Sequence, residues 1–230
     1  MLKITEFSNS ILTNINFHLS ESENLIILGS NGAGKSTLAK VLCALSHSDS
    51  VELFGKKLNM YSAKQRSLLV NYVPPKLEIF DEYISLREYL ELSKLYSKLT
   101  VDEVLELLNL KALEDKPCIT LSSGEGQLSL IASSLLHGAK LTIFDEPTAN
   151  LDPKKMQKVA KILSGDKIQN RIIITHDLNL AHKLGYKILY MSNGAVEFFD
   201  TNEKFFEKAN LDKLFGTSIK QIDGYFVVNL

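Results

Sequence analysis

The 230-residue sequence contains no tryptophan, only two cysteines and no apolar run that approaches the length of a membrane span. Such a span needs roughly 18 or more apolar residues, so we expect contact with a membrane only from its surface. Cys43 and Cys118 lie in different segments and form no metal-spaced cluster, which favours two reduced thiols in a cytosolic protein. Residues 1–6 carry an acid and lead into a strand-like run, unlike a secretory signal or a transit peptide.

Net charge is also nearly absent, because 26 Lys and Arg residues oppose 27 Asp and Glu residues and leave a formal charge of −1. This balance supplies no overall basic field, so we expect no nucleic-acid partner. Hydrophobic residues make up 45% of the chain, enough to bury a substantial core. The length predicts one large domain or a domain with an insertion.

Predicted strands alternate with helices over most of the chain, a pattern typical of an α/β fold with a mostly parallel sheet covered on both faces. The strand candidates are residues 26–28, 69–73, 141–144, 172–175, 187–191 and 195–199. We expect residues 1–75 and 138–200 to form this α/β core.

A helical pattern interrupts the alternation over residues 76–137, beginning after the break at Pro74 and Pro75. Ser85 and Thr100 are predicted helix N-caps, and a further helix is expected over residues 127–136. This stretch predicts a helical subdomain inserted into the core. Residues 201–230 are predicted to form a tail with a helix over 203–214 and a hairpin over 219–228.

One segment spells the phosphate-cradling pattern G-x-x-x-x-G-K-[ST] in full. A predicted strand at 24–28 precedes it, and a helix is expected from Ser36 onward, as the motif requires. Backbone N–H groups of such a loop point at an anion, so the segment predicts a nucleoside triphosphate ligand; a glycine-rich turn that merely caps a helix is the alternative. The predicted ligand residues are Gly29, Ser30, Asn31, Gly32, Ala33, Gly34, Lys35, Ser36 and Thr37.

Two adjacent carboxylates, Asp145 and Glu146, end another apolar strand, where open α/β sheets bind ligands. Asp145 can hold Mg²⁺ together with the Ser36 hydroxyl. Glu146 can accept a proton from the water that attacks the γ-phosphate. His176 follows the strand at 171–175 and can orient that water, although a pair of solvated acids and an incidental histidine would give the same pattern.

The segment Leu121, Ser122, Ser123, Gly124 and Glu125, called the signature segment below, precedes a predicted helix and by itself could be an ordinary N-cap. At this position, upstream of Asp145, the segment resembles the signature motif of the ATP-binding cassette (ABC) family, commonly Leu-Ser-Gly-Gly-Gln. The resemblance covers the chain, because the phosphate loop, the signature segment, the acidic strand, the loop 149–152 and His176 occur in the family's order.

The resemblance implies a P-loop NTPase of the ABC fold, with an N-terminal antiparallel β portion and an inserted helical subdomain. It implies an ATPase that uses ATP and Mg²⁺, with Lys35, Glu146 and His176 as catalytic residues. A second copy would pair head to tail, so that the signature segment of one copy covers the ATP of the other. Asn150 and Asp152 would lie in the loop between the copies.

Four further positions compare less simply with the family. Phe7 is the candidate for the aromatic side chain that stacks on adenine, although a core position is the alternative. The glutamine that the family places after Tyr-Val-Pro is replaced by Pro75, which offers no side-chain oxygen. Ser123 and Glu125 replace the Gly and Gln of the common signature. These departures concern coupling and turnover more than nucleotide binding.

Residues 175–181 and the tail at 211–216 and 222–224 resemble the ATPase subunits of iron-siderophore, haem and cobalamin importers. This subgroup implies a membrane permease partner, an extracytoplasmic substrate-binding protein, and a place at the cytoplasmic face of the membrane. Two other classes stay open. One is a soluble ABC-family ATPase not coupled to transport, and the other is a nucleotide-gated binding module with weak hydrolysis.

Overall fold

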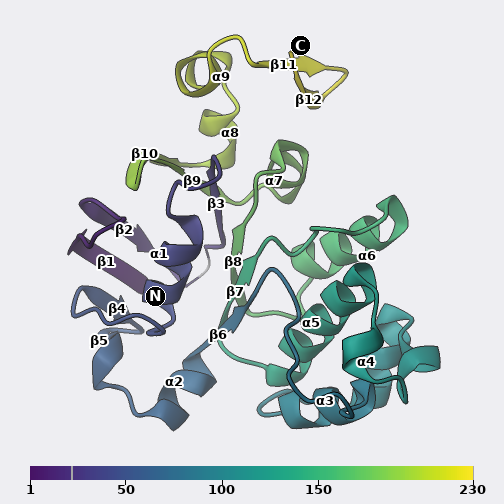
Figure 1. Ribbon diagram of the computed structural model, residues 1–230. Coiled ribbons are helices and arrows are strands. Elements are labelled where there is room, and N and C mark those ends of the chain that lie inside the picture. Colours follow the sequence, from purple (N-terminus) through teal and green to yellow (C-terminus); the bar gives the residue numbers. More distant parts are fainter. Residues whose placement is uncertain (22, 230) are drawn as a thin grey trace.

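A six-stranded sheet forms the centre of the computed structural model, which describes residues 1–21 and 23–229 (Figure 1). Strand β10 pairs antiparallel to β9, and the other neighbours pair in parallel, which confirms the mostly parallel sheet. In sheet order, the strands are β10 (Ala195–Asp200), β9 (Lys187–Ser192), β3 (Leu25–Gly29), β8 (Asn170–Ile174), β7 (Leu141–Asp145) and β6 (Val70–Val73).

Both faces of this sheet are buried, as the continuous apolar strands predicted. Alternate residues of a strand point to opposite faces, and in β3 Ile26 and Leu28 belong to one core cluster while Leu25 and Ile27 belong to another. The first cluster includes side chains of α5 (Ser123–His137), α6 (Pro153–Ser164) and α7 (Leu178–Leu184), and the second includes those of α1 (Lys35–Leu42).

A separate antiparallel sheet packs into the second cluster and confirms the N-terminal antiparallel portion. Its order is β2 (Ile15–Leu19), β1 (Leu2–Phe7), β4 (Val51–Leu53) and β5 (Lys56–Lys57). The register of β1 shifts between Ile4 and Phe7, and Glu6 in this interval has φ +49°. Because of this bulge, Leu2, Ile4 and Phe7 are all buried, so the usual alternation breaks at the end of the strand.

The stretch after β6 is helical. It contains α3 (Leu86–Ser93), α4 (Val101–Leu108), the 3₁₀ turns Lys111–Leu113 and Cys118–Thr120, and α5, gathered at the end of the molecule away from the C-terminal hairpin (Figure 1). Ser85 and Thr100 cap α3 and α4 through complete capping boxes with Glu88 and Glu103, which confirms the predicted N-caps. Helix α5 starts at Ser123, earlier than the predicted residue 127.

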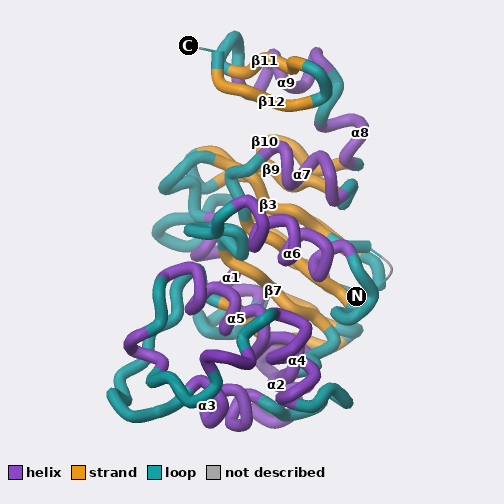
Figure 2. Tube along the Cα trace, turned by 90° about the vertical axis from the view of Figure 1, so that its right-hand side faces the viewer, coloured by secondary structure: helices purple, strands orange, loops and turns teal. Residues whose placement is uncertain are grey.

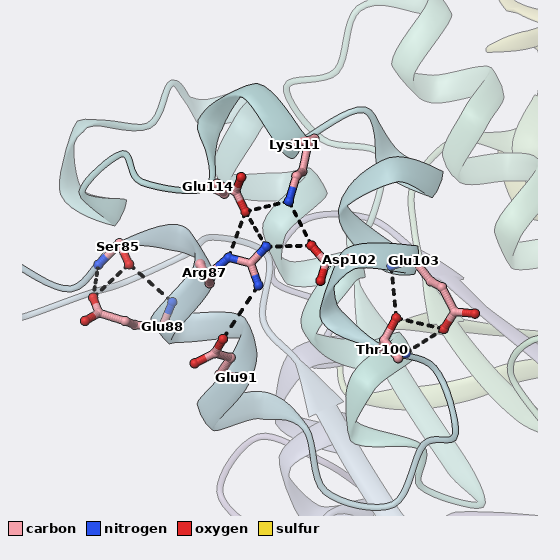
Figure 3. Close-up of polar contacts among 9 residues, drawn as sticks. All are labelled: Ser85, Arg87, Glu88, Glu91, Thr100, Asp102, Glu103, Lys111 and Glu114. Carbon is pink, nitrogen blue, oxygen red and sulfur yellow. Dashed lines mark hydrogen bonds and ion pairs between the residues drawn. The ribbon is translucent and has the colours of Figure 1, made fainter.

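Figure 3 shows an ion-pair cluster that joins the beginning of α3 to α4 and the turn that follows it. Arg87 contacts both Asp102 and Glu114, and Lys111 donates to the same two carboxylates at 2.8 and 3.0 Å. Hydrogen bonds from Lys111 and Arg87 lower the pKa of Asp102 to about 2. The cluster therefore ties the two helices into one unit, as networks do better than isolated surface pairs.

Two further sequence-based predictions need correction. The strand predicted from residue 69 begins at Val70, because Leu69 ends a capped helix, α2 (Ala63–Leu69), that follows the 3₁₀ turn Leu58–Met60. The single helix predicted at 203–214 is two helices, α8 (Asn202–Phe205) and α9 (Lys208–Phe215), with a break at Phe206 and Glu207.

The C-terminal hairpin was predicted correctly as β11 (Ile219–Ile222) and β12 (Tyr225–Val228), and it lies next to α9 at one end of the molecule (Figure 2). The buried Phe226 anchors it against His182 of α7 and against Phe206. The Asn179 side chain exchanges two hydrogen bonds with the Phe226 backbone, at 2.8 and 3.1 Å. The hairpin is thereby held on α7, the helix that follows His176.

A buried arginine at the start of β8 offers a test of the core. Arg171 is 4% exposed, and its guanidinium donates to the carbonyl oxygens of Leu163, Gly165 and Ile168 around the end of α6. We expect R171M to lower the free energy of unfolding in urea by about 3 kcal/mol, because three buried acceptors lose their charged donor. K161M on the exposed side of α6 should change it by less than about 0.5 kcal/mol. Equal losses in the two variants would contradict this role.

Candidate nucleotide site

The segment 29–37 connects β3 to α1 as a tight turn around the N-terminal end of the helix. Gly34 has φ +93°, and a Cβ atom there would lie 2.7 Å from a methyl carbon of Leu12. The position therefore requires glycine for both backbone and packing reasons. The resulting loop presents backbone N–H groups and the positive end of α1 to one pocket.

Lys35 is the first residue of α1 and is only 7% exposed. Its Nζ donates to the carbonyl oxygens of Gly29 and Ser30, at 2.8 and 2.9 Å. Burial lowers the pKa of Lys35, and the nearby charges of Glu146 and Asp145 oppose that shift. The Lys35 side chain therefore lies buried inside the loop, close enough to Asp145 and Glu146 for their negative charges to act on it.

A pocket of about 480 Å³ lies over this loop and brings together residues from four separate segments of the chain. Asp145 and Glu146 reach it from the end of β7, and Pro75 reaches it from the end of β6. The lining residues are Ile11, Asn31, Gly32, Ala33, Gly34, Lys35, Ser36, Thr37, Pro75, Asp145 and Glu146. Residues 31–37 of the predicted phosphate loop, with the predicted metal residues Ser36 and Asp145, thus face one common space, whereas Gly29 and Ser30 line a second cavity.

Asp145 ends β7 and is 2% exposed. Its Oδ2 accepts a hydrogen bond of 2.9 Å from the phenol of Tyr72, on the neighbouring strand β6. Burial raises the pKa of Tyr72, and the Asp145 charge adds to the shift, so the phenol remains a protonated donor. This contact was not predictable from the sequence, because it depends on which strand pairs with β7.

Glu146 follows β7 in a left-handed conformation, with φ +50°. Its N–H donates to the carbonyl of Ile174, and its own carbonyl accepts from the Gln127 side chain at 3.3 Å. The carboxylate oxygen Oε1 lies 3.0 Å from Nδ1 of His176, which follows β8 and is largely exposed. Two neighbouring strand ends therefore hold an acid and a histidine in direct contact at the pocket edge.

The signature segment lies outside this pocket. Ser122 caps α5, its Oγ accepts from the Glu125 N–H, and Glu125 in turn accepts from the Ser122 N–H at 2.8 Å. That backbone hydrogen bond, with help from the Lys116 ammonium at 3.3 Å, lowers the pKa of Glu125. Ser122 and Ser123 are exposed, and with Leu121 and Asn150 they line a separate cavity of about 630 Å³ that also reaches Pro75.

The loop after Glu146 lies against the signature segment. Asn150 has φ +60°, and its carbonyl oxygen would be 3.3 Å from a Cβ atom placed on Gly124. Asp152 caps α6 by accepting from the Lys155 N–H at 3.0 Å, which lowers its pKa. Any side chain at Gly124 would crowd this loop, so the two predicted interface segments are packed together within one chain.

The prediction for Phe7 needs correction. Phe7 is 8% exposed, belongs to the core cluster beneath the antiparallel sheet and does not line the pocket. The bulge in β1 turns it inward. The apolar residue that lines the pocket is Ile11, which is 51% exposed. Because Ile11 is aliphatic and lies in a loop, nothing in the sequence marked it as a residue of the nucleotide pocket.

Comparison with known proteins decides the family. The family model described as ABC transporter matches residues 12–149, more than half of the chain. A putative ABC transporter ATP-binding protein of Treponema denticola is 33% identical over 191 residues, which cover 81% of this chain and 39% of that protein. The chain belongs to the ABC transporter ATP-binding family. It spans about two fifths of the length of the curated relatives it matches.

Solved ABC structures share the fold. One chain of a putative metal-chelate type ABC transporter in an inward-facing conformation aligns with a TM-score of 0.77 at 22% identity, covering 100% of this chain and 97% of that one. A dimeric ATP-binding cassette in a post-hydrolysis state, bound to ADP and Pi, aligns with a TM-score of 0.75 at 22% identity, covering 88% and 99%. Identities this low support the ABC ATPase fold alone.

Within the described residues, no helix combines the length and apolar character that crossing a membrane requires.

Proposed function

We propose that this chain binds and hydrolyses ATP to energise transport by an ABC transporter. One observation carries the proposal. Residues 31–37, the Asp145 carboxylate and Glu146 meet at a single pocket, and His176, which lines a second cavity together with Gly29 and Ser30, lies 3.0 Å from Glu146. A turn that only capped a helix would not need the two acids Asp145 and Glu146. A solvated pair of acids would not be held by contacts from α5 and from the strands β6 and β8.

ATP and Mg²⁺ fit the donors of this pocket. The loop N–H groups and the Lys35 ammonium can neutralise phosphate oxygens. The Ser36 hydroxyl and the Asp145 carboxylate are the hard oxygen donors that Mg²⁺ prefers, and they would hold the ion together with water and phosphate. When bound, the ion would neutralise charge on the β- and γ-phosphates.

Glu146 would accept the proton of the attacking water, and His176 would orient the reacting groups. The water oxygen forms a bond to the γ-phosphorus, the bond to the bridging oxygen breaks towards ADP, and Glu146 takes a proton from the water. His176 Nδ1 contacts Glu146 Oε1, so the imidazole can fix the carboxylate and contact the γ-phosphate from the same side. Positioning and electrostatics thus come from groups already in place.

A second copy of the chain would complete the site. Ser122 and Gly124 lie in a helix-start segment with exposed serines, outside the pocket of their own chain. A head-to-tail dimer would place them over the partner's γ-phosphate, with Asn150 and Asp152 between the copies. The dimeric ABC cassette bound to ADP and Pi supports this arrangement by its shared fold.

A permease is the proposed membrane partner. The exposed apolar side chains Phe80, Tyr83, Leu92 and Leu95 surround cavities between β6 and α3. Five acids and one arginine lie between residues 78 and 91, so this face suits an apolar permease segment flanked by basic residues. The helical stretch 76–137 would transmit closure of the dimer to that segment.

The proposed subgroup is that of iron-siderophore, haem and cobalamin importers, at the cytoplasmic face of the membrane and served by a substrate-binding protein. The tail and the residues around His176 support it, as does the shared fold with a metal-chelate type transporter. Two rivals remain, a soluble ABC ATPase without transport and a weakly hydrolysing nucleotide-gated module, which Pro75 suggests. The intact Glu146–His176 pair favours hydrolysis over the second rival.

The proposal is tested by phosphate release from ATP by the purified chain, with Mg²⁺ and with EDTA, and by affinity purification from detergent-solubilised membranes of the source cells. We expect hydrolysis that requires Mg²⁺ and a co-purifying permease. ATP binding without Mg²⁺-dependent hydrolysis would instead support the nucleotide-gated module. Hydrolysis without any membrane partner would support the soluble ATPase.

A further inference from the structure

The Asp145 carboxylate is held from one side by a residue that belongs to neither the phosphate loop nor the acidic strand end. Tyr72 Oη donates to Asp145 Oδ2 at 2.9 Å. Among residues 1–21 and 23–229, no other side-chain hydrogen bond to this carboxylate is found. The phenol fixes Oδ2 from the β6 side, while Oδ1 accepts no side-chain hydrogen bond from the described residues.

Tyr72 lies close in the chain to Pro75, which lines the nucleotide pocket. Tyr72 lies in β6, the edge strand next to β7, and only Val73 and Pro74 separate it from Pro75. Pro75 lines the pocket but offers no side-chain donor or acceptor. The polar contact from the β6 side to the proposed metal carboxylate therefore comes from Tyr72.

We propose that Tyr72 is a positioning residue that orients Asp145 for Mg²⁺ in the nucleotide site. The inference rests on the proposed function and adds a residue to that site. Hydrogen bonds to a metal-binding carboxylate fix its rotamer, and their removal commonly weakens metal affinity 10–100-fold. Because β6 runs into the helical stretch, a shift of that stretch would reach the Mg²⁺ site through the phenol.

The test is the Mg²⁺ dependence of nucleotide binding, measured with mant-ATP fluorescence on the full chain. We expect Y72F to raise the Mg²⁺ midpoint about 10-fold while mant-ATP binding in EDTA stays within about twofold, because the phenol touches the carboxylate and not the loop. An unchanged Mg²⁺ midpoint in Y72F would overturn the inference. Failure of the wild-type chain to bind mant-ATP at all would instead overturn the proposed function.

A matched control separates positioning from a loss of stability. Tyr61 Oη donates to the Leu53 carbonyl at 2.8 Å in the antiparallel part of the molecule, so Y61F deletes the same atom and a similar hydrogen bond elsewhere. We expect Y61F to keep the wild-type Mg²⁺ midpoint, even if both variants lose similar thermal stability. A midpoint that rises equally in both variants would show a structural role only.

The Y72F substitution in a D145N variant tests whether Tyr72 acts through the Asp145 carboxylate. In D145N the carboxylate charge is gone, so Y72F should produce no further rise in the Mg²⁺ midpoint. Independent, additive losses from D145N and Y72F would mean that Tyr72 acts through another group, and would overturn the assignment.

Discussion

ATP hydrolysis should fall about 100–1000-fold in E146Q, while ATP binding is retained. Glutamine is nearly isosteric and can still accept a hydrogen bond from His176, so the pocket keeps its shape, but an amide cannot take the proton of the attacking water. Because hydrolysis is what would reopen the nucleotide-bound dimer, we expect E146Q to accumulate a dimer in Mg-ATP. Phosphate release and size-exclusion chromatography with light scattering measure both effects.

The control for E146Q is an acid-to-amide change far from the pocket. Glu203 lies in the first turn of α8, and E203Q should keep turnover within about twofold of the wild type. Wild-type turnover in E146Q would remove Glu146 from the role of base. A loss of ATP binding in E146Q would instead mean that the acid shapes the pocket.

ATP affinity should fall about 100-fold in K35A, since truncating one partner of a buried charged pair costs 2–5 kcal/mol. Lys35 is only 7% exposed, and its Nζ donates to the loop carbonyls of Gly29 and Ser30. Residues 29–37 contain no other lysine that could replace this ammonium. Isothermal titration with ATP measures the loss.

Lys40 provides the matched control, because it lies on the exposed side of the same helix. K40A should keep the wild-type affinity within about twofold. Thermal unfolding of K35A shows whether the loop keeps its fold. Near-wild-type affinity in a folded K35A would contradict the place of Lys35 at the phosphates.

The parts of the site that lie within one segment were predictable from the sequence. The phosphate loop, the two acids at the end of β7 and the histidine after β8 each come at the end of a continuous apolar run, and parallel strands bring their carboxyl ends to one edge. The capping boxes at Ser85 and Thr100 were equally visible, because they depend only on residues three apart.

The parts that depend on tertiary geometry were not predictable. Tyr72 and Asp145 are 73 residues apart in sequence, and their contact exists only because β6 pairs with β7. Phe7 was assigned to adenine because it is the aromatic residue at a suitable spacing before the phosphate loop, whereas the bulge in β1 turns its ring into the core. The helix predicted at 203–214 is interrupted because Phe206 packs against His182 and Phe226.

The central claim is that one chain supplies half of each hydrolytic site, and mixing two defective variants tests it most directly. K35A removes the ammonium of the phosphate loop, and S122R places a bulky cation in the signature segment. Each variant alone should therefore hydrolyse ATP at well under about a tenth of the wild-type rate. In an equal mixture, a head-to-tail dimer of one of each has one site with both Lys35 and Ser122. We expect recovery of up to about one quarter of wild-type activity in that mixture.

The matched mixture of K35A with the double variant K35A/S122R contains no intact Lys35 and should show no recovery. Phosphate release from the two mixtures is therefore the deciding measurement. Recovery in the first mixture alone is the expected result. Activity in the first mixture no greater than that of its separate components, with both variants folded and able to form mixed dimers, would contradict a site shared between two copies.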